Sequence, residues 1–104
     1  MIREVNAKEL KEITKEGLHL VDIYGSNCSP CKYLAEVLES FDIDYPFVSI
    51  LKLNADENPE LRRELQIFGV PTILLYKNGE IIERQVSSMS FEELEEFLAP
   101  HLYD

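Results

Sequence analysis

Apolar and polar positions along the chain follow two spacings that predict strands and helices in turn. Three short runs are almost continuously apolar, which is typical of strands covered on both faces of a sheet; they cover residues 18–24, 46–53 and 72–76. Apolar residues at helical spacing follow Cys28, and further helices are expected over 7–16, 59–66 and 91–102. Strands and helices therefore alternate along the chain.

Local signals mark where these elements begin and turn. Asn6 with Glu9 and Ser90 with Glu93 have the spacing of capping boxes at helix starts. The pair at 78–79, Asn-Gly, is a strong hairpin signal that joins 72–76 to a strand over 80–86. We therefore expect one α/β domain over residues 1–104, with a short first strand at 2–5 and a mixed central sheet flanked by helices on both faces.

The net charge of the chain limits the kinds of molecule that it is expected to bind. Ten Lys and Arg against 20 Asp and Glu leave a formal net charge of −10. Nucleic acids and anionic membranes are bound through clustered cations, so we expect neither as a partner. The acidic surface serves solvation or favours basic protein partners. The N-terminus has no basic start with a long apolar stretch behind it, and no segment is long enough to span a bilayer, so we expect a cytoplasmic protein.

Candidate chemistry lies in Cys28-Ser29-Pro30-Cys31, at a strand-to-helix junction. A helix N-terminus offers partial positive charge and free N–H groups, so the pKa of Cys28 should fall below its ordinary value of about 8.5. Cys31 lies one turn further, on the apolar face, and should stay a buried thiol. This asymmetry predicts that Cys28 attacks a substrate disulfide and that Cys31 resolves the mixed disulfide.

The cysteine pair has two alternative interpretations. A structural zinc site normally takes four ligands, and besides the two cysteines the chain offers only His19 and His101, without a second closely spaced pair. An inert pair of buried thiols conflicts with the exposed junction expected for Cys28. Redox exchange without a metal or a bound cofactor is therefore the favoured reading.

Several separated motifs, in order, resemble the thioredoxin family. The segment 21–32 is similar to its active-site segment, 52–59 to its next strand and turn, and 68–72 with 76–80 to its substrate-facing loop and hairpin. The spacing agrees from about residue 4 to the C-terminus. The resemblance implies the thioredoxin fold and thiol–disulfide exchange.

The resemblance also implies roles for further residues. Asp22 matches a partly buried carboxylate behind the cysteine pair that takes a proton from Cys31, and Lys52 matches a buried lysine near it. Pro71 matches a cis-proline that exposes the backbone of Val70 to an extended substrate segment. Without the resemblance, Asp22 would read as a buried group with its own hydrogen bonds, and Pro71 as an ordinary trans proline.

The chain departs from the family pattern beside the cysteines. Asn27 stands where the family typically has tryptophan, and Ser29 where it has glycine. The first change removes a flat apolar docking surface, and the second adds a hydroxyl near the thiolate. We expect substrates to contact this rim, with the binding residues Asn27, Ser29, Pro30, Val70 and Pro71.

The expected function is the reduction of protein disulfides by a monomer, with a reductase similar to thioredoxin reductase as electron donor. One alternative is a partner-specific binding module with little reductase activity. A second is an oxidase or isomerase outside the cytosol, which would need a leader sequence and a more oxidising potential. The cysteine pair and Asp22 disfavour the first, and the absence of a visible leader disfavours the second.

Overall fold

The computed structural model describes residues 1–102, so the last two positions of the domain expected over 1–104 lie outside the described residues. The strands and helices follow the expected order along the chain: β1 (Ile2–Glu4), α1 (Ala7–Ile13), β2 (Leu18–Tyr24), α2 (Ser29–Asp44), β3 (Ser49–Asn54), α3 (Pro59–Glu64), β4 (Thr72–Lys77), β5 (Glu80–Val86) and α4 (Phe91–Leu102).

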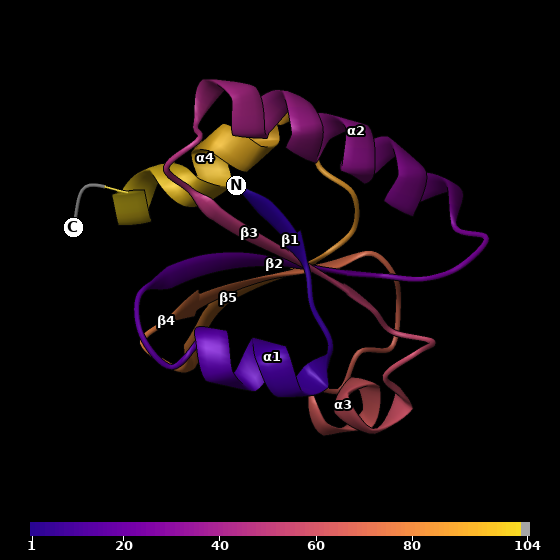
Figure 1. The fold of residues 1–104 in the computed structure, drawn as a ribbon. Helices are drawn as coiled ribbons and strands as arrows, with labels where there is room; N and C mark the ends of the chain where they lie inside the picture. The colour runs from indigo at the N-terminus through magenta and orange to yellow at the C-terminus, as the bar shows by residue number, and fades with distance from the viewer. Residues whose placement is uncertain (103–104) are drawn as a thin grey trace.

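The five strands form one mixed sheet in the order β1-β3-β2-β4-β5. Strands β1, β3 and β2 are parallel to one another. Strand β4 runs antiparallel to β2, and β5 runs antiparallel to β4. Helices α2 and α4 cover one face of the sheet and α1 and α3 cover the other (Figure 1). The predicted α/β fold with helices on both faces is confirmed.

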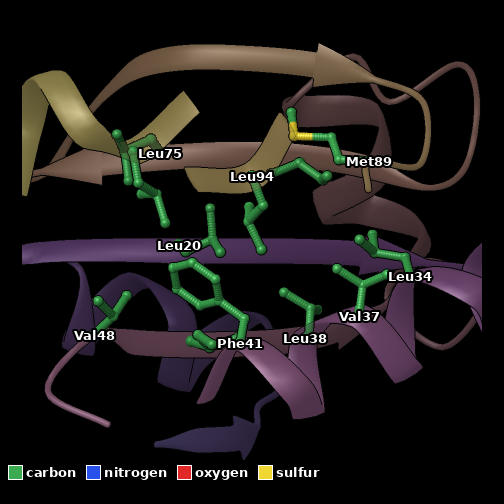
Figure 2. Packing of buried hydrophobic residues seen from close by; sticks show 12 residues of the cluster. Leu20, Leu34, Val37, Leu38, Phe41, Val48, Leu75, Met89 and Leu94 are labelled. Atoms are coloured by element: carbon green, nitrogen blue, oxygen red, sulfur yellow. The ribbon is translucent and has the colours of Figure 1, made fainter. Parts of the chain in front are cut away.

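A separate apolar core lies on each side of the sheet, because successive side chains of the strands point to opposite faces. On the α2 side, Phe41 is fully buried among leucines and valines from the sheet and the helices (Figure 2). Its ring stacks on Tyr45 with 4.4 Å between ring centroids. On the other side, Leu10 of α1 and Leu61 of α3 pack against the sheet. The first of these cores packs α2 against the sheet.

Both predicted capping boxes are present. The Asn6 side chain accepts a hydrogen bond from the Glu9 N–H at 2.9 Å, and the Glu9 carboxylate accepts one from the Asn6 N–H at 3.0 Å. Ser90 and Glu93 make the same reciprocal pair, at 3.1 and 2.9 Å. These contacts satisfy N–H groups that a helix start leaves unpaired.

Three predicted boundaries were wrong by a few residues. The helix expected over 7–16 ends at Ile13, where the Thr14 hydroxyl donates to the Leu10 carbonyl at 2.7 Å and Gly17 has a φ of 87°. The strand expected over 46–53 covers Ser49–Asn54, because the chain turns first with the Val48 N–H donating to Tyr45 O at 3.0 Å. The helix expected over 59–66 ends at Glu64, just before Gln66 takes a φ of 56°.

Within residues 1–102, no helix is both long enough and apolar enough to cross a membrane.

Candidate active site

The cysteine pair lies where β2 ends and α2 begins. Asn27 takes a left-handed φ of 52°, which turns the chain out of the strand. Cys28 is the N-cap of α2, and its Sγ accepts a hydrogen bond from the Cys31 N–H at 3.2 Å. Pro30 lies in the first turn, where its missing N–H leaves no partner unsatisfied. The helix start thus presents an N–H group to the Cys28 sulfur.

Cys28 and Cys31 form a disulfide bond, with 5.2 Å between their Cα atoms. The two sulfurs have different surroundings. Cys28 is partly exposed, whereas Cys31 is only 5% exposed, on the face of α2 that carries the buried Leu34. Cys28 is therefore the more exposed and Cys31 the buried member of the pair, as the sequence predicts.

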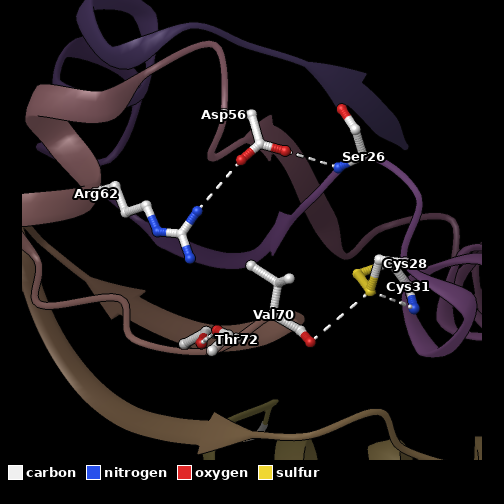
Figure 3. The surroundings of a disulfide bond; sticks show 8 residues. Ser26, Cys28, Cys31, Asp56, Arg62, Val70 and Thr72 are labelled. Carbon is white, nitrogen blue, oxygen red and sulfur yellow. Dashed lines mark hydrogen bonds and ion pairs between the residues drawn. A yellow bond between two sulfur atoms is a disulfide. The ribbon is translucent and has the colours of Figure 1, made fainter.

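A loop before β4 faces the disulfide. The Val70–Pro71 peptide bond is cis, and the Val70 carbonyl oxygen lies 3.8 Å from Cys28 Sγ (Figure 3). The Thr72 hydroxyl donates to the Gly69 carbonyl at 2.6 Å and so fixes the loop to the start of β4. A side chain at Gly25 would come within 2.9 Å of Val70, so this glycine lets the two loops approach.

Asp56 is a structural residue of the site to which the sequence analysis gave no role. Its Oδ2 accepts from the Ser26 N–H at 2.9 Å, and its Oδ1 lies 3.3 Å from Arg62 Nη1 (Figure 3). Arg62 also donates to the Ile67 carbonyl at 3.1 Å. These contacts connect the loop before Cys28 to the loop before Pro71. In the sequence, Asp56 is only an acidic residue just after the end of a strand. This pattern is too common to assign a role to the residue.

Asp22 lies in the middle of β2, on the face covered by α2, and is 1% exposed. Within residues 1–102, neither oxygen of its carboxylate has a hydrogen-bond partner. Burial raises the pKa of Asp22 to about 7, although Lys52 opposes the rise and Glu4 adds to it. Asp22 is therefore a buried carboxyl group that exchanges a proton near neutral pH.

Lys52 is the register partner of Asp22 on β3. It is half-buried rather than buried as the resemblance implies, and its Nζ lies 5.1 Å from the centroid of the Tyr24 ring. Among the described residues no carboxylate oxygen lies within 4.0 Å of this ammonium group. Lys52 thus acts on Asp22 through space and not as a contact ion pair.

An open cleft of about 300 Å³ lies beside Cys31 and Lys52. We call it the Cys31 cleft, and its lining includes Tyr24, Asn27, Cys31, Lys52 and Asn54. A larger cleft of about 410 Å³ lies between α1, α3 and the β4–β5 hairpin and touches neither cysteine. The Cys31 cleft has room for water beside Cys31.

Two apolar side chains beside the cis-proline loop are unusually exposed. Phe68 is 87% exposed and Val86 58% exposed, and a side chain on Gly69 would lie 3.3 Å from Val86. Phe68 lies in the segment 68–72, which the resemblance places in the substrate-facing loop, but it is not among the residues predicted to bind the substrate. Nothing in the sequence singles out Val86.

The two histidines, which are the remaining candidate zinc ligands, have other partners. His19 Nδ1 lies 2.7 Å from Ser49 Oγ, and its Nε2 lies 2.7 Å from the Glu16 carbonyl oxygen. His101 Nε2 lies 3.0 Å from Glu83 Oε2. Both rings are engaged outside the cysteine site.

The fold and the site together define a thiol–disulfide oxidoreductase, with a disulfide at a helix start facing a cis-proline loop over a mixed sheet. The thioredoxin family model matches residues 2–100. A thioredoxin of Staphylococcus haemolyticus is 36% identical over 102 residues, covering 97% of this chain and 98% of the relative. A thioredoxin of Chlamydia muridarum is 33% identical over 101 residues, covering 97% and 99%. The chain belongs to the thioredoxin family.

Membership of this family gives the class of reaction. The chain is a thiol–disulfide oxidoreductase that acts on protein disulfides, and a reductase returns it to the dithiol form. The redox-active group of the family is the cysteine pair itself.

Proposed function

We propose that this protein reduces protein disulfides, with Cys28 as the nucleophile and Cys31 as the resolving thiol. The observation that carries the assignment is the difference between the sulfurs: Cys28 is the partly exposed N-cap of α2, and Cys31 is 5% exposed one turn further on. An N-cap sulfur gains most from the N–H groups and dipole of the helix when it is a thiolate.

The reaction takes two exchanges. The Cys28 thiolate attacks one sulfur of the substrate disulfide, forms a mixed disulfide and releases the other substrate sulfur as a thiolate, which takes up a proton. Cys31 then loses its proton and attacks Cys28 Sγ, which breaks the mixed disulfide and frees the second substrate thiol. Two electrons have then passed to the substrate, and the second exchange has formed the Cys28–Cys31 disulfide that the structure contains.

Asp22 is the proposed acceptor of the Cys31 proton, directly or through water in the Cys31 cleft. A general base works best when its pKa lies near the working pH, and the pKa of Asp22 is raised to about 7 by burial. Lys52 limits this rise because its positive charge favours the carboxylate. We therefore assign Asp22 and Lys52 to proton transfer.

The substrate is proposed to bind as an extended segment along the cis-proline loop. The Val70 carbonyl lies 3.8 Å from Cys28 Sγ, so a segment paired with the Val70 backbone carries its disulfide toward that sulfur. Pro71 fixes this backbone, while Asn27, Ser29 and Pro30 form the exposed rim on the α2 side. These five residues are the proposed substrate contacts.

For the cellular setting, we propose a cytoplasmic monomer that regains electrons from a reductase similar to thioredoxin reductase. A chain whose only two cysteines form an exchange pair suits a reducing compartment. The net charge of −10 opposes binding to nucleic acid or anionic membranes.

Turnover of insulin disulfides, with dithiothreitol or with thioredoxin reductase and NADPH, tests the function. We expect turnover by the wild type and none by Cys28→Ser. The Cys31→Ser variant should accumulate a mixed disulfide through Cys28, visible on non-reducing gels. A wild type without dithiol-dependent turnover, together with partner capture that survives both substitutions, would instead identify the alternative binding module.

A further inference from the structure

Three charged side chains form a row across the parallel strands beneath α2. Glu4 on β1 and Asp22 on β2 are both register partners of Lys52 on β3. Tyr24 lies two residues beyond Asp22 on β2, and residues two apart in a strand point to the same face. Glu4, Lys52, Asp22 and Tyr24 therefore share one face of the sheet.

Tyr24 contacts two members of this row, Glu4 and Lys52. Its hydroxyl donates to Glu4 Oε2 at 2.8 Å, and its ring lies below the Lys52 ammonium, 5.1 Å from Nζ to the ring centroid. A cation within about 6 Å of an aromatic centroid is attracted to the face of the ring. Burial and the bond to Glu4 raise the pKa of Tyr24 to about 12, so its hydroxyl remains a donor at physiological pH.

The position of Lys52 matters because its positive charge stabilises the ionised form of Asp22. Its carboxylate oxygens lack hydrogen-bond partners within the described part of the chain, and its partner on β4 is the apolar Ile73. The charged groups that act on Asp22 are Lys52 and Glu4, while Glu57 acts on Tyr24. A small movement of one ammonium group would therefore change the charge balance at Asp22.

We propose that Tyr24, fixed by Glu4, is a positioning residue that holds the Lys52 ammonium over its ring and out of contact with the Asp22 carboxylate. Tyr24 and Lys52 both line the Cys31 cleft, so this arrangement lies beside the resolving sulfur. If the ring were absent, the lysine could approach Asp22 and stabilise its charged form. The inference rests on the proposed role of Asp22 for its functional meaning.

The test is a titration of the Asp22 carboxyl carbon by NMR in the oxidised protein, with the signal assigned from the spectrum of Asp22→Asn. Tyr24→Leu should lower the titration midpoint by about one pH unit, because an approaching cation favours the carboxylate. Tyr24→Phe keeps the ring and loses the tether, so it should give a smaller decrease. Glu80→Gln removes an exposed charge at the far end of the sheet and is the matched control.

A double-mutant cycle separates positioning from a simple opening of the site to water. Lys52→Met should raise the Asp22 midpoint, and in this background Tyr24→Leu should have no further effect, because Tyr24 acts through Lys52. An unchanged midpoint in Tyr24→Leu, or an equal decrease with and without Lys52, would overturn the proposal. If Tyr24→Leu does not fold, Tyr24→Phe takes its place in the cycle.

The titration needs neither substrate nor reduced cysteines, so it is independent of insulin turnover. A midpoint that moves as expected while Asp22→Asn leaves the resolving step unchanged would support the positioning role and reject Asp22 as the base. If Asp22→Asn slows the resolving step but Tyr24→Leu leaves the Asp22 midpoint unchanged, Asp22 would be supported as the base and the positioning role of Tyr24 would be rejected.

Discussion

Replacement of Asp22 by asparagine is expected to stabilise the folded protein above neutral pH. Burial raises the pKa of Asp22 from 3.8 in a free side chain to about 7. Between these two values the native state holds a proton that the unfolded state has lost, so stability decreases as pH rises. At 1.36 kcal/mol for each unit of pKa, the raised pKa lowers the free energy of unfolding by about 4 kcal/mol at pH 8 and by about 2 kcal/mol at pH 5.

Denaturant unfolding of the oxidised protein at both pH values measures this difference. The asparagine side chain has nearly the same size and cannot ionise, so other titrating groups cancel between the wild type and the variant. We expect the advantage of Asp22→Asn to grow by about 3 kcal/mol from pH 5 to pH 8. An advantage that stays constant with pH, or shrinks, would refute a raised pKa at this position.

Two further predictions concern the exposed rim and the core. Phe68→Ala should raise KM for insulin about 5-fold, which is equivalent to about 1 kcal/mol of lost binding free energy, and should change kcat little. The control is Phe47→Ala, which removes a 70% exposed ring at the other end of the sheet. Equal effects of the two would argue against substrate contact at Phe68. Phe41→Ala should lower the free energy of unfolding by about 3–5 kcal/mol in denaturant titrations, because the ring is fully buried; a loss under about 1 kcal/mol would contradict the packing described here.

The sequence predicts the order and type of the elements because their signals are local. Apolar runs, the capping boxes at Asn6 and Ser90, and the Asn78-Gly79 hairpin each act within a few residues. The ends of elements are less predictable, since they depend on contacts made later in folding. Thr14 is the example: its hydroxyl bonds to the Leu10 carbonyl and the helix stops, although the sequence continues with good helix formers.

The site was predictable where its chemistry is confined to one segment. The spacing of Cys28 and Cys31 before a helix predicts one accessible and one shielded sulfur, and the structure has both. The contacts of Glu4, Tyr24 and Lys52 depend instead on which strands are neighbours. No pattern in the sequence states that β1 lies beside β3, and the hydrogen bond of Tyr24 to Glu4 follows only from that arrangement.

Alkylation of the reduced protein over a range of pH tests the central claim, that the two sulfurs differ in reactivity and role. Limited reaction with iodoacetamide, followed by mass spectrometry of the peptides, gives the rate at each cysteine. We predict that Cys28 is alkylated well below pH 8 while Cys31 stays protected. Equal rates at the two cysteines, or faster reaction at Cys31, would contradict the assignment of nucleophile and resolving thiol.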